Sequence, residues 1–402
     1  MFAPTLDLAY RERDAFPASR ESLPLALVAI GGIGEPHARD SRLRAAVAKR
    51  LEGAPAGVPI VVLGDVFEHA GLVGFCTPDD PNEPPRASEP GCDTRGSLDA
   101  QFDAILTPYA RSFAGHPLVA LAGSADHAGD PEATANACAR IPAAAPGWRY
   151  VARGCELGDA RAVARLDAGA LALVLLDSEA MLADADFLDH ALAALHAELA
   201  TLRQERPDAW LVLALYHPLE SYGAHNGANL ANALHKDLYP WFGALAAPLS
   251  HPSGPYEWGV RGLRRALYRA LAESPVDAVL SGQDESLQLV ELDHPGARWQ
   301  IVSGAGSQKS HVKRLGLDWM WTSRAARALG LGGWLPAVRH SMVFAAGRGD
   351  DSSRSGYGFA TLSASPERLR VEFWDLARAA PLGVAELVRA GHPAQGGERE
   401  DQ

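Results

Sequence analysis

Carboxylate and imidazole side chains recur just after short apolar runs of this chain. The clearest case is Asp65, which follows the β-branched run Ile60–Leu63 and Gly64. A strand that ends in Gly-Asp places a carboxylate at the carboxyl edge of a sheet, where open α/β folds bind their ligands. Asp65 is therefore the first candidate for chemistry. The competing interpretation is a turn residue, because Gly-Asp is also a common turn sequence.

Segments of a similar build recur along the chain and combine glycine with carboxylate, imidazole or amide groups. They are Gly31–Pro36, Ala122–His127, Tyr216–Gly227 and Ser281–Gln288. Carboxylates and imidazoles in such segments can hold divalent cations, and imidazoles can also transfer protons. The repetition makes a shared site at strand ends more plausible than any one segment would.

Short strands alternate with helical patterns in the first half of the chain, and hairpin-rich strands follow in the second half. This order predicts an α/β fold with two mixed β-sheets flanked by helices, in four layers, α/β/β/α. The predicted helices are Arg42–Leu51, Leu98–Phe113, Leu188–Leu202 and Val260–Ala272. The predicted strands are Leu25–Gly31, Ile60–Leu63, Leu118–Leu121, Ala162–Leu166, Ala170–Leu176, Trp210–Leu215, Ala278–Leu280, Leu287–Leu292, Gln300–Ser303, Ser341–Ala345, Phe359–Leu362 and Leu369–Phe373.

Composition sets the expected boundaries of the folded unit. We expect an N-terminal arm over residues 1–24, one domain over 25–378 and a polar tail over 379–402. The segment Gly74–Gly96 is rich in Pro, Asp and Gly and is the expected specificity loop. The four arginines of the helix Val260–Ala272 are expected on one solvated face.

The formal net charge of −12 and the absence of a Lys/Arg cluster argue against nucleic-acid binding, which needs cations against the phosphates. No apolar stretch is long enough to cross a membrane, and the first 22 residues are interrupted by charges. We therefore expect a soluble, acidic, cytoplasmic protein. A periplasmic or secreted location follows if an N-terminal signal is missing from this sequence.

The four cysteines form two pairs of hairpin-like separation, Cys76 with Cys92 and Cys138 with Cys155. Such spacing fits two local disulfides in an oxidising compartment, and it fits four free thiols equally well. None of the spacings is that of a CxxC zinc site.

Taken together, the segments resemble the calcineurin-like metallophosphoesterase superfamily, and most closely its purple-acid-phosphatase-like branch. The family's blocks GDxG, GDNxYxxG, GNHD, HHPxxSxGxHxG and GHDHxLQ, and then an SGAGS-like strand, occur in the same order from roughly Leu25 to Asp375. The matching stretches are Gly31–Gly34, Gly64–Gly71, Gly123–Asp126, Tyr216–Gly227, Gly282–Gln288 and Ser303–Ser307. The resemblance implies the four-layer fold and, in the family, two divalent cations bridged by a carboxylate.

The departures from the family fall on its metal site. Asp65, at the position of the bridging carboxylate, keeps its residue type. Other site positions of the family are occupied here by Gly32, Glu68, Ser124, Ala125, Tyr216, Gln283 and Glu285. Losing a residue that merely orients a ligand costs about 10–100-fold in metal affinity or activity. Losing most of the ligands themselves should abolish a two-metal site of the family type.

A rebuilt site for one or two ions of Mn, Fe, Zn or Mg is the alternative. Its candidate ligands are Asp65, Glu68, Asp126, His127, His217 and Glu285. The resemblance implies a substrate-facing position for His225, which makes it the candidate catalytic residue. The competing interpretation for His217 and His225 is a hydrogen bond to loop backbone. For Glu68 and Glu285 it is a solvent-facing position or a pair with an arginine.

We therefore predict a metallophosphoesterase-fold protein without a cofactor that has lost phosphatase activity. Its expected ligand is a protein partner or a phosphorylated small molecule held in the former active site. The alternative is an active, metal-dependent phosphoester hydrolase with a rebuilt site.

Overall fold

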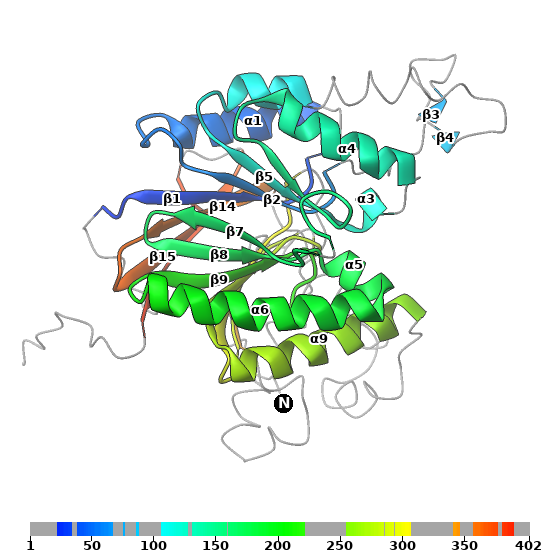
Figure 1. The fold of residues 1–402 in the computed structure, drawn as a ribbon. Coiled ribbons are helices and arrows are strands. Elements are labelled where there is room, and N and C mark those ends of the chain that lie inside the picture. Colours follow the sequence, from blue (N-terminus) through cyan, green and yellow to red (C-terminus); the bar gives the residue numbers. More distant parts are fainter. Residues whose placement is uncertain are drawn as a thin grey trace, which may run out of the picture.

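Two seven-stranded sheets lie face to face, and helices cover the outer face of each (Figure 1). This arrangement confirms the predicted four-layer α/β/β/α class. The structure is a computed structural model. It describes residues 22–33, 38–66, 75–76, 86–87, 106–127, 131–158, 160–221, 255–284, 286–292, 294–306, 341–345, 357–376 and 380–389.

The first sheet joins parallel strands from the start of the chain to antiparallel strands from its end. In spatial order it contains β16 Gly383–Val388, β15 Arg368–Asp375, β14 Gly358–Ala364, β1 Leu25–Ile30, β2 Ile60–Leu63, β5 Leu118–Leu121 and β6 Arg149–Val151. Strands β1, β2, β5 and β6 run parallel, so their carboxyl ends lie at one edge. Strand β14 pairs antiparallel with β1 in the middle of the sheet.

The second sheet has a parallel centre with antiparallel strands at both sides. In spatial order it contains β13 Ser341–Ala345, β11 Leu287–Glu291, β12 Ala297–Ser303, β10 Val276–Ser281, β9 Trp210–Leu215, β8 Leu171–Leu175 and β7 Ala164–Ala168. Strands β8, β9, β10 and β12 run parallel. The short strands β3 Phe75–Cys76 and β4 Arg86–Ala87 pair separately, within the segment expected as a specificity loop.

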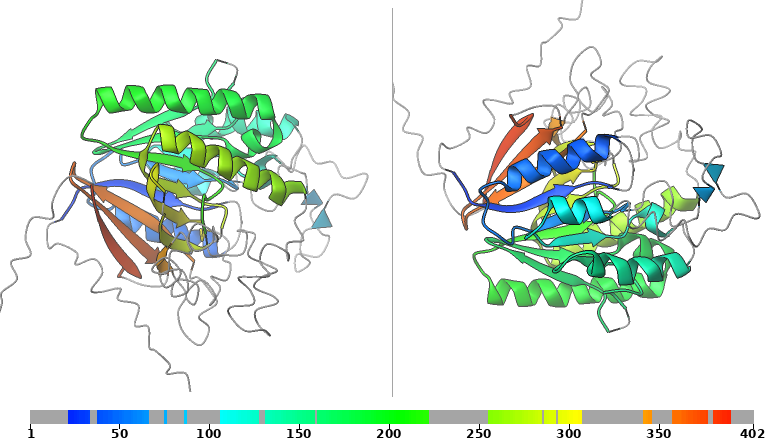
Figure 2. Two further views of the ribbon diagram at one scale, coloured as in Figure 1. Left: turned by 90° about the horizontal axis from the view of Figure 1, so that it is seen from below. Right: turned by 90° about the horizontal axis from the view of Figure 1, so that it is seen from above.

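Helices α1 Ala38–Leu51 and α4 Pro131–Ala144 cover the first sheet, and α6 Ala185–Glu205 and α9 Pro255–Glu273 cover the second (Figure 2). Two short helices, α3 Ser124–His127 and α5 Ser178–Ala183, start beyond the carboxyl ends of β5 and β8. Residues 106–112 are also helical. None of the helices in the described part of the chain is long and apolar enough to cross a membrane.

The core has two parts because the parallel strands of the first sheet are buried on both faces. In β2, Val61 and Leu63 pack with the second sheet, whereas Ile60 and Val62 pack with the apolar face of α1. Strands buried on both sides become continuous apolar runs. This is why IVVL is a recognisable strand in the sequence.

Several predicted elements have their predicted bounds. Strands β2, β5, β9 and β13 begin and end at the expected residues. The long amphipathic helix is confirmed as α6, which extends three residues further at each end. Its buried positions Phe187, Ala191, Leu195 and Leu199 recur every four residues, as expected for one helical stripe.

Other elements differ from the prediction. Helix α1 begins four residues early, at Ala38, and the β7–β8 hairpin turns after Ala168, with Gly169 at a φ of +59°. Strand β6 and helix α4 are not predicted. Residues 383–388, expected in a polar tail, form β16 instead. Alternate residues of β16, Gly383, Ala385 and Leu387, are buried, and the strand extends the first sheet through its pairing with β15.

The expectation of one solvated arginine face on α9 is wrong for Arg264. Its side chain is half-buried, and its Nε donates to the carbonyl oxygen of Pro218 at 2.8 Å. Arg265 and Arg269 are exposed, as expected. The helix therefore presents a narrower charged face than its sequence indicates.

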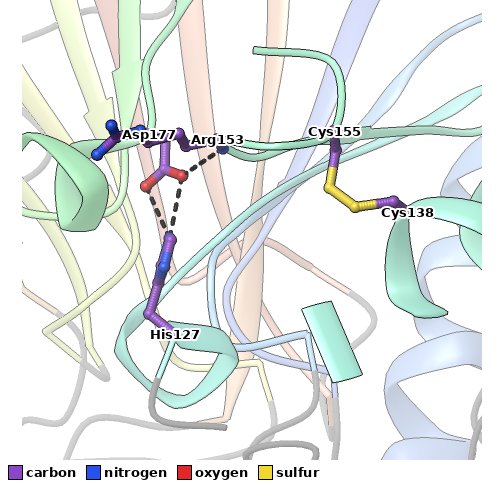
Figure 3. The surroundings of a disulfide bond; sticks show 5 residues. All are labelled: His127, Cys138, Arg153, Cys155 and Asp177. Carbon is purple, nitrogen blue, oxygen red and sulfur yellow. Dashed lines mark hydrogen bonds and ion pairs between the residues drawn. A yellow bond between two sulfur atoms is a disulfide. The ribbon is translucent and has the colours of Figure 1, made fainter. Parts of the chain in front are cut away.

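A disulfide joins Cys138 in α4 to Cys155 in the turn after β6, with Cα atoms 5.3 Å apart (Figure 3). The first of the two alternatives for this cysteine pair is therefore confirmed. Cys92, the expected partner of Cys76, lies outside the described residues.

Candidate functional site

Parallel strands of both sheets end at the same edge of the molecule and bring their following residues into contact. From the first sheet, β2 leads to Asp65 and β5 leads to Ser124. From the second, β8 leads to Asp177, β9 to Tyr216 and β10 to Gln283. The hydrogen bonds given below join these groups into a polar cluster, so the strand-end segments do converge.

Asp65 lies in a strained turn at this edge. Among the non-glycine residues that the structure describes, Asp65 alone has a positive φ, at +50°. Gly64, which precedes it, has a φ of +102°. Oδ1 of Asp65 accepts from the backbone N–H of Ala125 at 2.8 Å, and its Oδ2 accepts from the hydroxyl of Tyr216 at 2.5 Å. Burial raises the pKa of Asp65, and these hydrogen bonds oppose that rise.

The ring of Tyr216 fills the space between two glycines at the strand ends. A Cβ atom added to Gly64 would lie 2.2 Å from Cδ2 of Tyr216, and one added to Gly123 would lie 2.9 Å from Cε2. The hydroxyl also lies 2.9 Å from Oγ of Ser124. Burial, and then the charge of Asp65, raise the pKa of Tyr216 well above its usual value. Tyr216 therefore keeps its proton and donates it.

Asp126 joins the two loops that follow β2 and β5. Its Oδ2 accepts from the backbone N–H groups of Gly123 at 2.8 Å and Val66 at 3.2 Å, and the residue is buried. These bonds order the loop backbone around Asp65. Its role as a metal ligand stays a prediction.

His127 pairs with Asp177, a buried carboxylate that the sequence analysis does not single out. The imidazole Nε2 lies 3.0 Å from both oxygens of Asp177 (Figure 3). Asp177 also accepts from the backbone N–H of Ala180, as the N-cap of α5, and from that of Arg153. Burial lowers the pKa of His127, but the hydrogen bond and charge of Asp177 outweigh it, so the pKa is raised.

His217 lies in the buried part of the cluster and contacts side chains. Its Nδ1 lies 2.9 Å from Oγ of Ser178, and its Nε2 lies 2.9 Å from the hydroxyl of Tyr256 and 3.3 Å from Oε1 of Glu179. The predicted alternatives for this residue were a metal or loop backbone. The observed partners are Ser178, Glu179 and Tyr256, none of which the sequence analysis names.

Glu179, Tyr256 and Gln283 complete the cluster. The hydroxyl of Tyr256 donates to Oε1 of Glu179 at 2.6 Å, and Nε2 of Gln283 lies 3.3 Å from the same hydroxyl. Burial raises the pKa of Glu179, but its contacts with His217 and Tyr256 prevail and lower it. The sequence signal that could have pointed to Glu179 is the segment Asp177-Ser178-Glu179, in which a good N-cap residue follows an apolar run.

The structure brings Asp65, Asp126, His127 and His217 to one edge. Glu68, Glu285 and His225 lie outside the described residues. Among the residues that the structure does describe, no group of three or more His, Cys, Asp or Glu side chains is arranged to hold a metal ion. These residues do not fit the two-cation centre of the resembled family, because Asp65 is bonded on both oxygens and Tyr216 fills the space beside it.

Two solved structures share this architecture over most of the chain. GAP50, the anchor in the inner membrane complex of Plasmodium, superposes with a TM-score of 0.50 at 12% identity, over 91% of this chain and 89% of that one. Purple acid phosphatase PPD1 from yellow lupin (Lupinus luteus) seeds superposes with a TM-score of 0.51 at 13% identity. The chain has the metallophosphoesterase fold of the purple acid phosphatases.

Because the sequence identities are only 12% and 13%, the similarity shows a shared fold and no more. The match to the lupin phosphatase covers 93% of this chain but 55% of the plant protein. No protein-family model matches the chain, and no curated protein matches it.

Proposed function

We propose that this phosphoesterase-fold protein binds a ligand or partner at the former active site without hydrolysing a phosphoester. The observation that carries the proposal is the hydroxyl of Tyr216 on Oδ2 of Asp65 at 2.5 Å. A bridging carboxylate must offer its oxygens to two cations. Here a backbone N–H occupies one oxygen and a phenol occupies the other.

Metal binding would require Tyr216 to leave a well-packed position. Its ring contacts Gly64 and Gly123, and its side chain is buried, so displacement would expose an aromatic ring and break the bonds to Asp65 and Ser124. Removing a hydrogen-bond partner from a buried group costs about 1–3 kcal/mol, and more for a charged group. The arrangement therefore favours the protein without the two cations.

The comparison with GAP50 supports a binding role. That protein is described as an anchor, so a protein with this fold can serve assembly. We propose the domain over residues 25–378 as the binding unit, extended to include β16 because this strand completes the first sheet. The N-terminal arm and the tail beyond β16 stay outside the proposal.

An active hydrolase with a rebuilt one- or two-metal site is the second candidate. The observation in its favour is that Asp65, Asp177 and Glu179 bring three carboxylates to the edge where His127 and His217 also lie. Glu68, Glu285 and His225 would complete such a site with Mn, Fe, Zn or Mg. Each of these three carboxylates already has hydrogen-bond or ion-pair partners. Those contacts would have to rearrange before a metal ion could bind.

Elemental analysis separates the two candidates. The purified protein is analysed for metals before and after incubation with Mn²⁺, Fe²⁺, Zn²⁺ or Mg²⁺, and the same samples are assayed with an aryl phosphate. We expect folded protein with far less than one ion per chain and no hydrolysis. Near-stoichiometric metal and an activity that Asp65→Asn abolishes, while the distant control Glu273→Gln keeps it, would establish the hydrolase instead.

A further inference from the structure

Tyr256 fixes the directions of the hydrogen bonds in the cluster of Glu179, Tyr256 and Gln283. A phenol has one proton, and Tyr256 donates it to Oε1 of Glu179 at 2.6 Å. The phenol oxygen must therefore accept the bonds from Nε2 of Gln283 at 3.3 Å and from Nε2 of His217 at 2.9 Å. This orients the amide of Gln283 with its nitrogen toward Tyr256.

The amide oxygen of Gln283 is then left without a partner. Oε1 is buried and accepts no hydrogen bond from the described residues, and the residue as a whole is 8% exposed. Buried polar atoms in native proteins are almost always paired, so an orphaned acceptor indicates a missing donor. A group that completes this cluster must bring an N–H or O–H to Oε1.

Charge narrows the choice of donor. Glu179 is a carboxylate whose Oε1 contacts Tyr256 and His217, and its Oε2 accepts no hydrogen bond within the described part of the chain. Arg264 and His127 also act on this cluster, but beside the Glu179 carboxylate itself an anion such as a phosphate would be repelled and a cation attracted. The net charge of −12 has the same effect at longer range.

Exposure shows where such a group would enter. Tyr256 is 45% exposed. Among the described residues, no other large hydrophobic residue is exposed. The hydroxyl of Tyr256 makes the hydrogen bonds given above, while the residue as a whole is partly open to solvent. An aromatic face beside buried acceptors is a favourable place for an organic cation.

We propose that Glu179, Tyr256 and Gln283 bind a positively charged nitrogen group, an ammonium or guanidinium. The group donates to Oε1 of Gln283 and Oε2 of Glu179 and lies against the ring of Tyr256. This inference rests on the proposed binding function. It favours a cationic ligand over the phosphorylated one. The cation is a lysine or arginine side chain of a protein partner, or a free amine.

Titration with model cations tests this directly. The full chain is titrated by calorimetry and NMR with Nα-acetyl-lysine methylamide, Nα-acetyl-arginine methylamide, n-butylamine and the uncharged analogue Nα-acetyl-norleucine methylamide. We expect the cations to bind and the norleucine analogue not to bind. Tighter binding of the amino-acid derivatives than of n-butylamine supports a side chain of a partner, and equal binding supports a free amine.

Variants connect the binding to these residues. Because hydrogen bonds to charged groups are the stronger ones, Gln283→Leu and Glu179→Gln should each weaken cation binding about tenfold or more. Glu273→Gln, at the far end of α9 and 77% exposed, is the matched control and should bind as the parent does. If Glu179→Gln does not fold, Gln283→Leu gives the same test, since it removes the amide whose Oε1 has no partner, together with the Nε2 that contacts Tyr256.

The outcomes separate the two proposals. Metal-free, inactive protein that binds none of the cations, or binds the norleucine analogue equally well, would overturn this inference and leave the proposed function standing. Stoichiometric metal with aryl-phosphate hydrolysis would overturn the proposed function itself. Cation binding that Gln283→Leu and Glu179→Gln leave unchanged would also overturn the inference.

Discussion

The hydroxyl of Tyr216 donates a 2.5 Å hydrogen bond to Asp65, a residue 151 positions earlier in the chain. The bond connects the end of β9 in the second sheet to the end of β2 in the first. It therefore joins the two sheets at the edge where the strand-end segments converge. A tyrosine at this position satisfies the carboxylate without a metal and fixes the distance between the strand ends.

The Tyr216–Asp65 bond should contribute measurably to stability. We expect Tyr216→Phe to lower the free energy of unfolding by about 1.5–3 kcal/mol, because it removes a hydrogen bond to a buried charged group. Urea unfolding of Tyr216→Phe, Asp65→Asn and the double variant forms a cycle that isolates the pair. Additive effects of the two substitutions would show that the bond contributes nothing.

Gly123 should tolerate no side chain. An added Cβ would lie 2.3 Å from the backbone nitrogen of Asp65 and 2.4 Å from its Oδ1. We expect Gly123→Ala to lower the free energy of unfolding by about 1–3 kcal/mol, as overpacking does. Gly262→Ala is the matched control, because nothing lies within 4 Å of its Cβ. In the helix α9 this control should gain about 0.5–1 kcal/mol. Equal effects of the two substitutions would contradict the packing described here.

Much of the fold is predictable from the sequence, because buried strands and amphipathic helices have local signals. The run IVVL of β2 and the leucine stripe of α6 are examples. Strand β16 is missed because its buried residues include Gly383 and Ala385, which give little apolar pattern. Its place in the sheet depends on pairing with β15, which is not a local property.

The candidate site is predictable in location but not in its contacts. Asp65, His127 and His217 lie at the predicted edge, since the parallel strands of each sheet end together there. The contacts depend on how the two sheets approach each other, which is not a local property of the sequence. This holds for the bond of Tyr216 to Asp65 and for that of His127 to Asp177. Tyr256, the second residue of α9, lies 39 residues after His217, and no spacing rule connects the two.

The His127–Asp177 pair should make stability depend on pH. The pKa of His127 is raised above its ordinary 6.5 in the folded state, so its contribution is fully present below that value. It is lost as pH rises through the folded-state pKa. We expect His127→Gln to lose more stability relative to the parent at about pH 5.5 than at about pH 8.5. His190→Gln, an exposed position on α6, is the control for urea unfolding at both pH values. A difference that grows with pH would contradict the pairing.

The disulfide Cys138–Cys155 should stabilise the turn that carries Arg153. The backbone N–H of Arg153 donates to Asp177 at 2.8 Å, so this turn supports the carboxylate that holds His127. The two cysteines are 17 residues apart. A loop of this length gives about 3 kcal/mol of stabilisation. We expect the double variant Cys138→Ala/Cys155→Ala to lose about that much in urea under oxidising conditions. As a control, the same double variant is unfolded under reducing conditions. Any further loss of stability there is caused by reduction of other cysteines. Unchanged stability of the variant relative to the oxidised parent would show that these cysteines are not bonded in solution.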